Sequence, residues 1–96
     1  MTGYTWDPRK NQKLITERGV SFEDILKAIG ENGLVDIADH PNPSKYPAQK
    51  IYVVRLAGYL YLVPHEEIGG KIRLITIIPS RKASRKYGKG GGRNEG

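Results

Sequence analysis

The sequence predicts an α+β domain in which two N-terminal helices pack on a three- to four-stranded antiparallel sheet and a short C-terminal helix follows. Two segments near the start of the chain carry helix-start signals. From Leu34 onward, the apolar residues form short β-like runs separated by turn residues. Helices followed by a series of strands are typical of a sheet covered on one face. A chain of 96 residues buries a single core, so one domain is expected.

The first two predicted elements are a strand and a helix. Residues 4–6 form a short β-like run, which indicates an edge strand. Asp7 and Pro8 then predict a helix start, because Asp accepts a backbone N–H at the N-cap and Pro loses no useful donor at the first helical position. This helix is expected over residues 8 to about 17, and Gly19 is suited to end it.

The second predicted helix has a stronger start signal. Ser21 and Asp24 have the spacing of a capping box. Apolar residues then recur at helical spacing and form one face that should pack against a sheet; they are Phe22, Ile25, Leu26 and Ile29. Gly30 or Gly33 should end this helix.

The strands are predicted over residues 34–38, 50–56, 59–63 and 71–78. Ala57 and Gly58 predict a hairpin between the second and third of these runs, since Gly permits the positive φ of a tight turn. Residues 65–70 are interpreted as a further turn. A loop stiffened by three prolines, residues 39–47, joins the first two strands.

The C-terminal part is predicted to divide at residue 88. Ser80 is suited to cap a short helix that ends near Tyr87, and residues 89–96 form a flexible glycine-rich tail. The predicted organisation is therefore a single domain over residues 1–88 followed by that tail. Residues 1–79 carry ten Lys/Arg and nine Asp/Glu, whereas residues 80–96 carry six Lys/Arg and one Glu. This clustered positive charge favours an anionic partner such as RNA.

Composition also excludes several classes of protein. There is no cysteine, so neither a disulfide nor a thiolate metal site is expected, and a reducing compartment fits. His40 and His65 alone make a poor metal site, and no metal or cofactor is expected. No run approaches the roughly 20 apolar residues of a membrane span, which predicts a cytoplasmic protein without a membrane partner. Walker, dinucleotide-binding and nucleophile-elbow motifs are absent from the sequence.

Three clusters remain as candidates for chemistry. The first is basic and aromatic, and it could stabilise charge on a phosphate and transfer a proton; its residues are Arg81, Lys82, Arg85, Lys86 and Tyr87. The second is the proline-rich loop with His40, Tyr46 and the nearby Gln49. The third supplies Lys10 and Arg18 as candidate phosphate contacts. The alternative interpretations are a solvated basic helix and a surface histidine without a role.

In this order, the clusters resemble the BrnT-type toxins of bacterial toxin–antitoxin systems. The matching segments are WDP (6–8), KN (10–11), RGVSFED (18–24), HPN (40–42), YP (46–47), QK (49–50), GYLYLVP (58–64) and IPSRKA (78–83). Many of these toxins have Lys-His where this chain has Glu17-Arg18, and commonly Ile-Ser-Ala where it has Ile78-Pro79-Ser80. The resemblance implies a RelE-like ribonuclease fold, messenger-RNA cleavage that inhibits translation, and neutralisation by a cognate antitoxin encoded alongside.

The leading hypothesis is a metal-independent endoribonuclease. RNA supplies its own nucleophile, the 2′-OH, so the protein needs a proton acceptor, a proton donor and cations. We assign proton transfer to His40 or Tyr87, phosphate binding to Arg81 and Lys82, and base stacking to Tyr46. The expected partners are RNA, including ribosome-associated mRNA, and a small DNA-binding antitoxin from the same operon. A non-catalytic RNA- or ribosome-binding module and an interaction protein that docks an acidic antitoxin segment are the alternatives.

Overall fold

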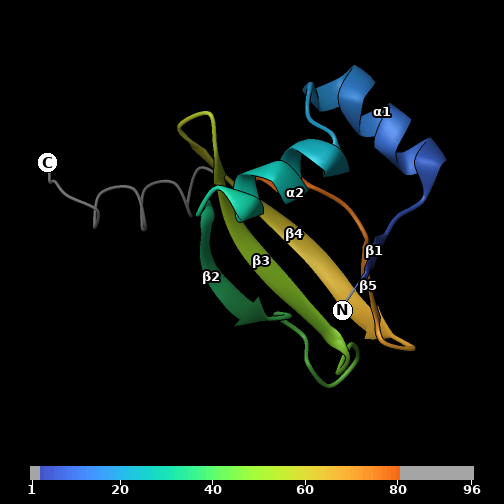
Figure 1. Ribbon diagram of the computed structural model, residues 1–96. Helices are drawn as coiled ribbons and strands as arrows, with labels where there is room; N and C mark the ends of the chain where they lie inside the picture. The colour runs from blue at the N-terminus through green and yellow to red at the C-terminus, as the bar shows by residue number, and fades with distance from the viewer. Residues whose placement is uncertain (1–2, 81–96) are drawn as a thin grey trace, which may run out of the picture.

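The computed structural model describes residues 3–80 of the chain. They form two helices and a six-stranded sheet (Figure 1). The elements are β1 (Gly3–Thr5), α1 (Pro8–Arg18), α2 (Phe22–Gly30), β2 (Leu34–Asp39), β3 (Gln49–Leu56), β4 (Tyr59–Ile68), β5 (Lys71–Leu74) and β6 (Ile78–Pro79). The strand order is β1-β5-β4-β3-β2, and β6 pairs with β4 as well. The sheet is mixed, because β1 runs parallel to β5 while the other pairs are antiparallel.

The predicted fold class was wrong in two respects. The sheet has six strands of mixed direction, not three or four antiparallel ones, because β1 joins β5 in parallel and β6 adds a further pairing. Within residues 3–80 no helix follows α2, and Ser80, the predicted helix cap, instead donates its backbone N–H to the Leu60 carbonyl at 3.1 Å. The rest of the predicted C-terminal helix, the boundary at residue 88 and the predicted tail all lie outside the described residues. The RelE-like arrangement as we expected it is therefore not the fold described here.

Both predicted helix starts are confirmed. The Asp7 carboxylate accepts the backbone N–H of Arg9 at 2.9 Å, and Gly19 ends α1 in the left-handed region with φ of 69°. In α2, the Ser21 hydroxyl accepts the Asp24 N–H and the Asp24 carboxylate accepts the Ser21 N–H, each at 3.0 Å. These local hydrogen bonds satisfy donors at the helix N-termini that have no partner within the helix.

Asn11 fixes the first helix to the start of the second. Its side-chain oxygen accepts the backbone N–H of Phe22 at 2.8 Å, and its amide donates to a Glu23 carboxylate oxygen at 2.8 Å. Asn11 is buried, so both halves of its amide need partners of this kind. The hydrogen bond from Asn11 is also the largest cause that lowers the pKa of Glu23. Asn11 therefore has a structural role, because it joins the two helices.

The hairpin between β3 and β4 is confirmed, but β4 continues further than predicted. Ala57 and Gly58 have φ of 55° and 76°, as a two-residue hairpin turn requires. The turn predicted over residues 65–70 was wrong, since β4 runs to Ile68 and the next turn is at Gly69 and Gly70. The predicted strand ends at residue 63 because the next residue, Pro64, lacks a backbone N–H for the ladder.

Pro64 has no backbone N–H to donate. It is tolerated in β4 because the N–H of this position would point toward an irregular part of the sheet. Its carbonyl accepts the Ile75 N–H at 2.9 Å, so the backbone polar groups of this residue face the β5–β6 side. There the register passes from His65↔Leu74 to Leu62↔Ile78, which places three residues opposite two. Such a bulge interrupts the ladder, and a proline beside it removes no regular hydrogen bond. The bulge also divides the predicted strand over residues 71–78 into β5 and β6.

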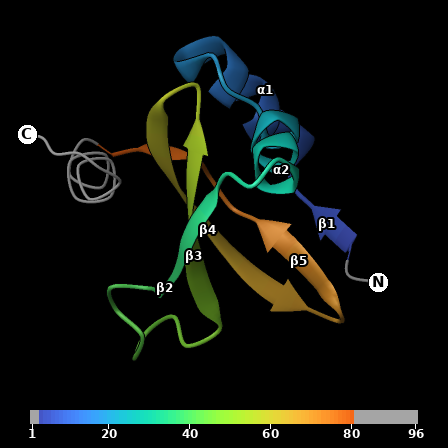
Figure 2. The same ribbon diagram turned by 60° about the vertical axis from the view of Figure 1, so that its left-hand side comes forward.

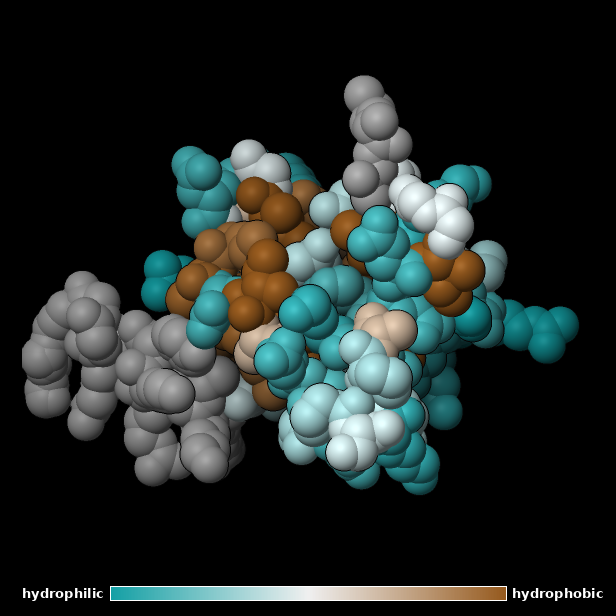
Figure 3. All heavy atoms as spheres, turned by 90° about the horizontal axis from the view of Figure 1, so that it is seen from below, coloured by the Kyte–Doolittle hydropathy of each residue, from teal (hydrophilic) through white to brown (hydrophobic). Residues whose placement is uncertain are grey.

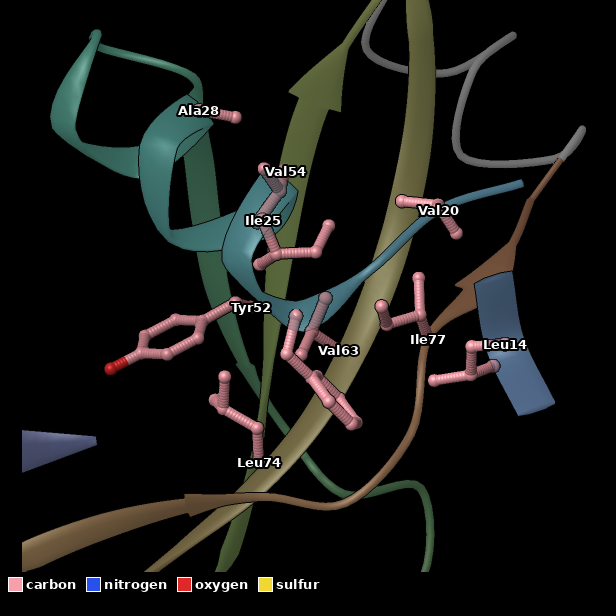
Figure 4. Close-up of a cluster of buried hydrophobic side chains, with 10 residues drawn as sticks. Leu14, Val20, Ile25, Ala28, Tyr52, Val54, Val63, Leu74 and Ile77 are labelled. Atoms are coloured by element: carbon pink, nitrogen blue, oxygen red, sulfur yellow. The ribbon is translucent and has the colours of Figure 1, made fainter. Parts of the chain in front are cut away.

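The core lies between the helices and one face of the sheet, as predicted for the second helix (Figure 4). Its buried members are Leu14, Val20, Phe22, Ile25, Ala28, Tyr52, Val54, Val63, Leu74 and Ile77. Figures 1 and 2 show both helices over one end of the sheet, while the lower ends of β3, β4 and β5 extend beyond them. Part of the same sheet face is therefore covered by neither of the two helices within residues 3–80 (Figures 1 and 2). Within residues 3–80, neither helix combines the length and hydropathy that a membrane span requires.

Candidate active site

The structure brings together two residues of the predicted loop cluster. His40 and Tyr46 lie in the loop after β2, and their ring centroids are 4.5 Å apart with the planes tilted by 41°. The Lys45 ammonium lies 5.5 Å from the centroid of the Tyr46 ring. An aromatic pair with a cation beside it is suited to contact a nucleobase and its phosphate.

The hydrogen bonding of His40 is unfavourable for a general base. The backbone N–H of Asn42 donates to His40 Nδ1 at 3.0 Å. A neutral imidazole whose Nδ1 accepts a hydrogen bond carries its proton on Nε2, so neither nitrogen has a free lone pair. His40 can act as a base only after this hydrogen bond breaks.

Lys10, a predicted phosphate contact, and Gln49, a member of the predicted loop cluster, line one pocket of about 410 Å³. The other residues that line it are Asp7, Glu66, Arg73, Leu74 and Ile75. Among the described residues that line this pocket, two cationic and two carboxylate side chains balance in charge. The attraction for phosphate expected from Lys10 is therefore partly balanced by its neighbours.

Arg18 has a structural contact in addition to its predicted role. Its guanidinium donates to the backbone carbonyl of Ile77, a buried residue at the bulge between β5 and β6. The contact joins the end of α1 to this part of the sheet, while a role in nucleic-acid binding stays a prediction. The remaining predicted site residues lie outside the described part of the chain, and their roles also stay predictions; they are Arg81, Lys82, Arg85, Lys86 and Tyr87.

A second pocket, which was not predicted from the sequence, lies on the sheet face beyond the helices. It has a volume of about 230 Å³ and is lined by Ile37, Ala48, Lys50, Tyr52, His65, Glu67 and Ile72. The strand register explains this grouping. Lys50 lies directly opposite His65, and the two-residue period of a strand places Tyr52 and Glu67 on the same face. Seen from below, the molecule is largely hydrophilic with an apolar patch to one side (Figure 3).

His65 is held as a neutral base in this pocket. Only 6% of the residue is exposed, and its ring stacks on Tyr52 with centroids 3.7 Å apart. His65 Nδ1 lies 3.1 Å from the Val63 carbonyl, which can only accept, so Nδ1 carries the proton and Nε2 keeps its lone pair. Burial lowers the pKa of His65, and the nearby Lys50 charge lowers it further. The imidazole therefore has the protonation state of a general base at neutral pH.

Two polar groups lie near His65: the hydroxyl of Tyr52, which is neutral, and the ammonium of Lys50, which is charged and weakly paired. Burial raises the pKa of Tyr52 to about 12, and a hydrogen bond with Tyr4 adds to the shift. The Tyr52 hydroxyl therefore stays protonated. Lys50 Nζ lies 2.9 Å from Asp39 Oδ1, and the two side chains are 58% and 76% exposed. Exposed ion pairs of this kind contribute about 0–1 kcal/mol, so Lys50 can exchange Asp39 for a phosphate.

A signal for this pocket was present in the sequence. The turn at Ala57 and Gly58 was predicted, and a two-residue turn fixes the register of both strands. Extending that register past Pro64 places His65 opposite Lys50. The predicted strand over residues 59–63 ends before this proline, so it does not extend to His65.

A base, a protonated phenol and a cation beside one pocket are the groups that phosphodiester cleavage by an internal nucleophile requires. The family model for the ribonuclease toxin BrnT of type II toxin–antitoxin systems matches residues 6–86. The chain belongs to this BrnT toxin family. The match confirms the resemblance noted in the sequence, and it includes Lys50, Tyr52 and His65. No curated protein matches the chain significantly.

The buried His65 predicts a pH-dependent stability for this BrnT-family chain. Because its pKa is lowered in the folded state, the unfolded chain binds the proton first as the pH falls. The free energy of unfolding should thus be highest above about pH 6.5 and decrease as the pH falls through the folded-state pKa. Urea unfolding at a series of pH values measures this dependence. The His65→Phe variant should lose the slope in this window, and an unchanged slope would assign it to other groups.

Proposed function

We propose that this chain is a metal-independent endoribonuclease toxin that cleaves messenger RNA in the cytoplasm and so inhibits translation. The observation that carries the proposal is the neutral His65, stacked on Tyr52 and opposite Lys50, on the part of the sheet face that neither α1 nor α2 covers (Figure 1). Membership of a ribonuclease toxin family supports RNA as the substrate.

In the proposed reaction, His65 Nε2 accepts the proton of the RNA 2′-OH while the 2′ oxygen attacks the adjacent phosphorus. The bond between the 2′ oxygen and phosphorus forms as the bond to the 5′ oxygen breaks. Lys50 stabilises the negative charge on the non-bridging oxygens. The 5′ oxygen takes a proton, for which Tyr52 and Tyr87 are the proposed donors. The products are a 2′,3′-cyclic phosphate and a 5′-hydroxyl end.

The other predicted residues are proposed to hold the RNA around this pocket. His40 and Tyr46 lie in the loop that also supplies Ala48 to the pocket, so this aromatic pair is suited to contact a base next to the scissile phosphate. Arg81 and Lys82 are proposed to contact that phosphate. The flanking nucleotides are assigned to Lys10, Arg18, Gln49, Arg85 and Lys86.

A cognate antitoxin is the proposed protein partner, since the family consists of toxins of type II toxin–antitoxin systems. We propose that it is a small DNA-binding protein encoded in the same operon. The substrate is proposed to be free or ribosome-associated mRNA. Growth and RNA integrity after induction, with and without the neighbouring gene, test the pairing.

Cleavage of a defined RNA by the purified chain tests the reaction. We expect cleavage in the presence of EDTA, products that end in a cyclic phosphate, and resistance of a substrate with a single 2′-deoxy nucleotide at the cleaved position. A substrate that binds with steep salt dependence but stays intact, with and without ribosomes, would overturn the proposal and favour a non-catalytic RNA-binding module.

A further inference from the structure

One ionisable group of the candidate active site has no part in the proposed reaction. Glu67 lines the same pocket as Lys50, Tyr52 and His65, which are proposed to transfer protons and to stabilise the phosphate. Glu67 is exposed, and within residues 3–80 its carboxylate makes neither a hydrogen bond nor an ion pair. This carboxylate is therefore available to a ligand in the pocket.

The strand register places Glu67 between two apolar residues and close to the proposed general base. Glu67 lies opposite Ile72 of β5, and the register of β3 and β4, extended by one residue, brings Ala48 opposite it on the other side. Ile72 packs against the core, so this wall of the pocket is fixed. His65 precedes Glu67 by two residues, so the two share a face of the sheet at a spacing of about 7 Å along the strand.

A carboxylate at this position favours a hydrogen-bond donor over a phosphate. Its negative charge repels the RNA backbone, so Glu67 is unsuited to bind phosphate. Nucleobases, in contrast, carry N–H groups on edges that single-stranded RNA leaves accessible. Their flat rings can pack on the apolar side chains that line the pocket, which are Ile37, Ala48 and Ile72. Apolar walls with a few directed polar groups are typical of sites that bind small ligands.

Guanine is the base whose hydrogen-bonding edge matches a carboxylate. An ionised carboxylate has two acceptor oxygens and no donor. The N1–H and the N2 amine of guanine are adjacent donors that can bind both oxygens, and bidentate pairs with a charged partner are strong. Adenine and cytosine each present one amine beside a ring nitrogen that only accepts, and uracil presents one N–H between two carbonyls. In these three bases an acceptor would face a carboxylate oxygen.

We propose that Glu67 determines the base specificity of this site: its carboxylate binds the N1–H and N2 amine of the guanine whose ribose supplies the attacking 2′-OH. This inference rests on the proposed ribonuclease function. The spacing between His65 and Glu67 suits a single nucleotide, because its 2′-OH and the edge of its base lie at opposite ends of one unit. The cleaved bond then follows a guanosine, and the ring pair of His40 and Tyr46 remains for the following base.

The test measures kcat/KM on four short RNAs that differ only in the base on the 5′ side of a single cleavable phosphate. A fifth substrate carries inosine at this position, which keeps the N1–H but lacks the N2 amine. The variants are Glu67→Gln and Glu66→Gln. Glu66 is the matched control, because it is the neighbouring residue in β4, points to the other face and lines a different pocket.

We expect the wild-type chain to cleave after guanosine about 100-fold more efficiently than after the other three nucleosides, and about tenfold more efficiently than after inosine. Glu67→Gln should lose most of this preference, because an amide has one acceptor oxygen and turns a donor toward the second N–H. Glu66→Gln should keep the preference. Equal kcat/KM for the four bases, a preference for another base, or a guanine preference that Glu67→Gln retains would each overturn the inference.

Binding of the four nucleoside 3′-monophosphates, followed by NMR, separates this inference from the proposed function. These ligands carry the base and the phosphate but contain no bond that the enzyme would cleave. If the wild-type chain cleaves no RNA, the proposed function fails. A preference for guanosine 3′-monophosphate that Glu67→Gln abolishes would still support the role of Glu67, whereas equal binding of all four would overturn it.

Discussion

Replacement of His65 by phenylalanine is expected to reduce RNA cleavage by at least about 100-fold, the usual lower range for loss of a general base. Phenylalanine keeps a ring that can stack on Tyr52 but has no nitrogen to accept the 2′-OH proton. Because the His65 pKa is lowered, the wild-type rate should rise with pH through that pKa and then level off. The variant should lose this dependence. Single-turnover cleavage of one defined RNA over a range of pH measures both effects.

His40→Ala provides the comparison for this experiment, since it removes the other histidine of the chain. His40 already accepts a hydrogen bond from the Asn42 backbone, so its loss should reduce cleavage less than the loss of His65. Circular dichroism and urea unfolding of both variants show whether each remains folded. If a folded His65→Phe protein were fully active and His40→Ala were inactive, His40 in the loop after β2 would be the base and His65 would not.

Local signals in the sequence predicted the helices and the hairpin. The bonds made by Asp7 and by the pair Ser21 and Asp24 span two or three residues, so neighbouring residue types determine them. The hairpin turn likewise depends on two adjacent residues with positive φ. Such features could be predicted because the residues that form them are close in sequence.

Long-range pairing was not predicted, and it accounts for the wrong sheet. The parallel pairing of Gly3 with Lys71 joins segments from opposite ends of the fold, and no local pattern specifies it. The bulge that divides β5 from β6 depends on how the chain around Ile77 packs in the core and accepts a hydrogen bond from Arg18. A sequence pattern shows that residues 71–78 are apolar, but it does not show where their ladder breaks.

The candidate site could be predicted only where its residues are neighbours in the sequence. His40 and Tyr46 were grouped correctly because one loop carries both. The group of Lys50, Tyr52 and His65 comes from two strands, and recognising it requires the register past Pro64. Clustered positive charge in residues 80–96 is a strong sequence signal, whereas one lysine, Lys50, opposite one buried histidine, His65, is a weak one.

Replacement of Lys50 by alanine is expected to reduce kcat/KM for RNA cleavage by about ten- to a hundredfold. The change removes a cation that stabilises charge on the phosphate in the transition state. If Lys50 acted only through its ion pair with Asp39, loss of either partner would have a similar effect on kcat/KM. The Asp39→Asn variant separates the two possibilities.

Asp39→Asn frees the Lys50 ammonium from its carboxylate partner, so it should raise kcat/KM at low salt by up to about fivefold, the value of an exposed ion pair. The gain should diminish as salt screens the charges. Lys71→Ala is the matched control, since Lys71 also lies on a strand of this sheet but its neighbour Ile72 faces the pocket, which places Lys71 on the opposite face. It should leave cleavage of a short RNA nearly unchanged. If Lys50→Ala and Asp39→Asn lowered the rate equally, Lys50 would act through the ion pair and not through the phosphate.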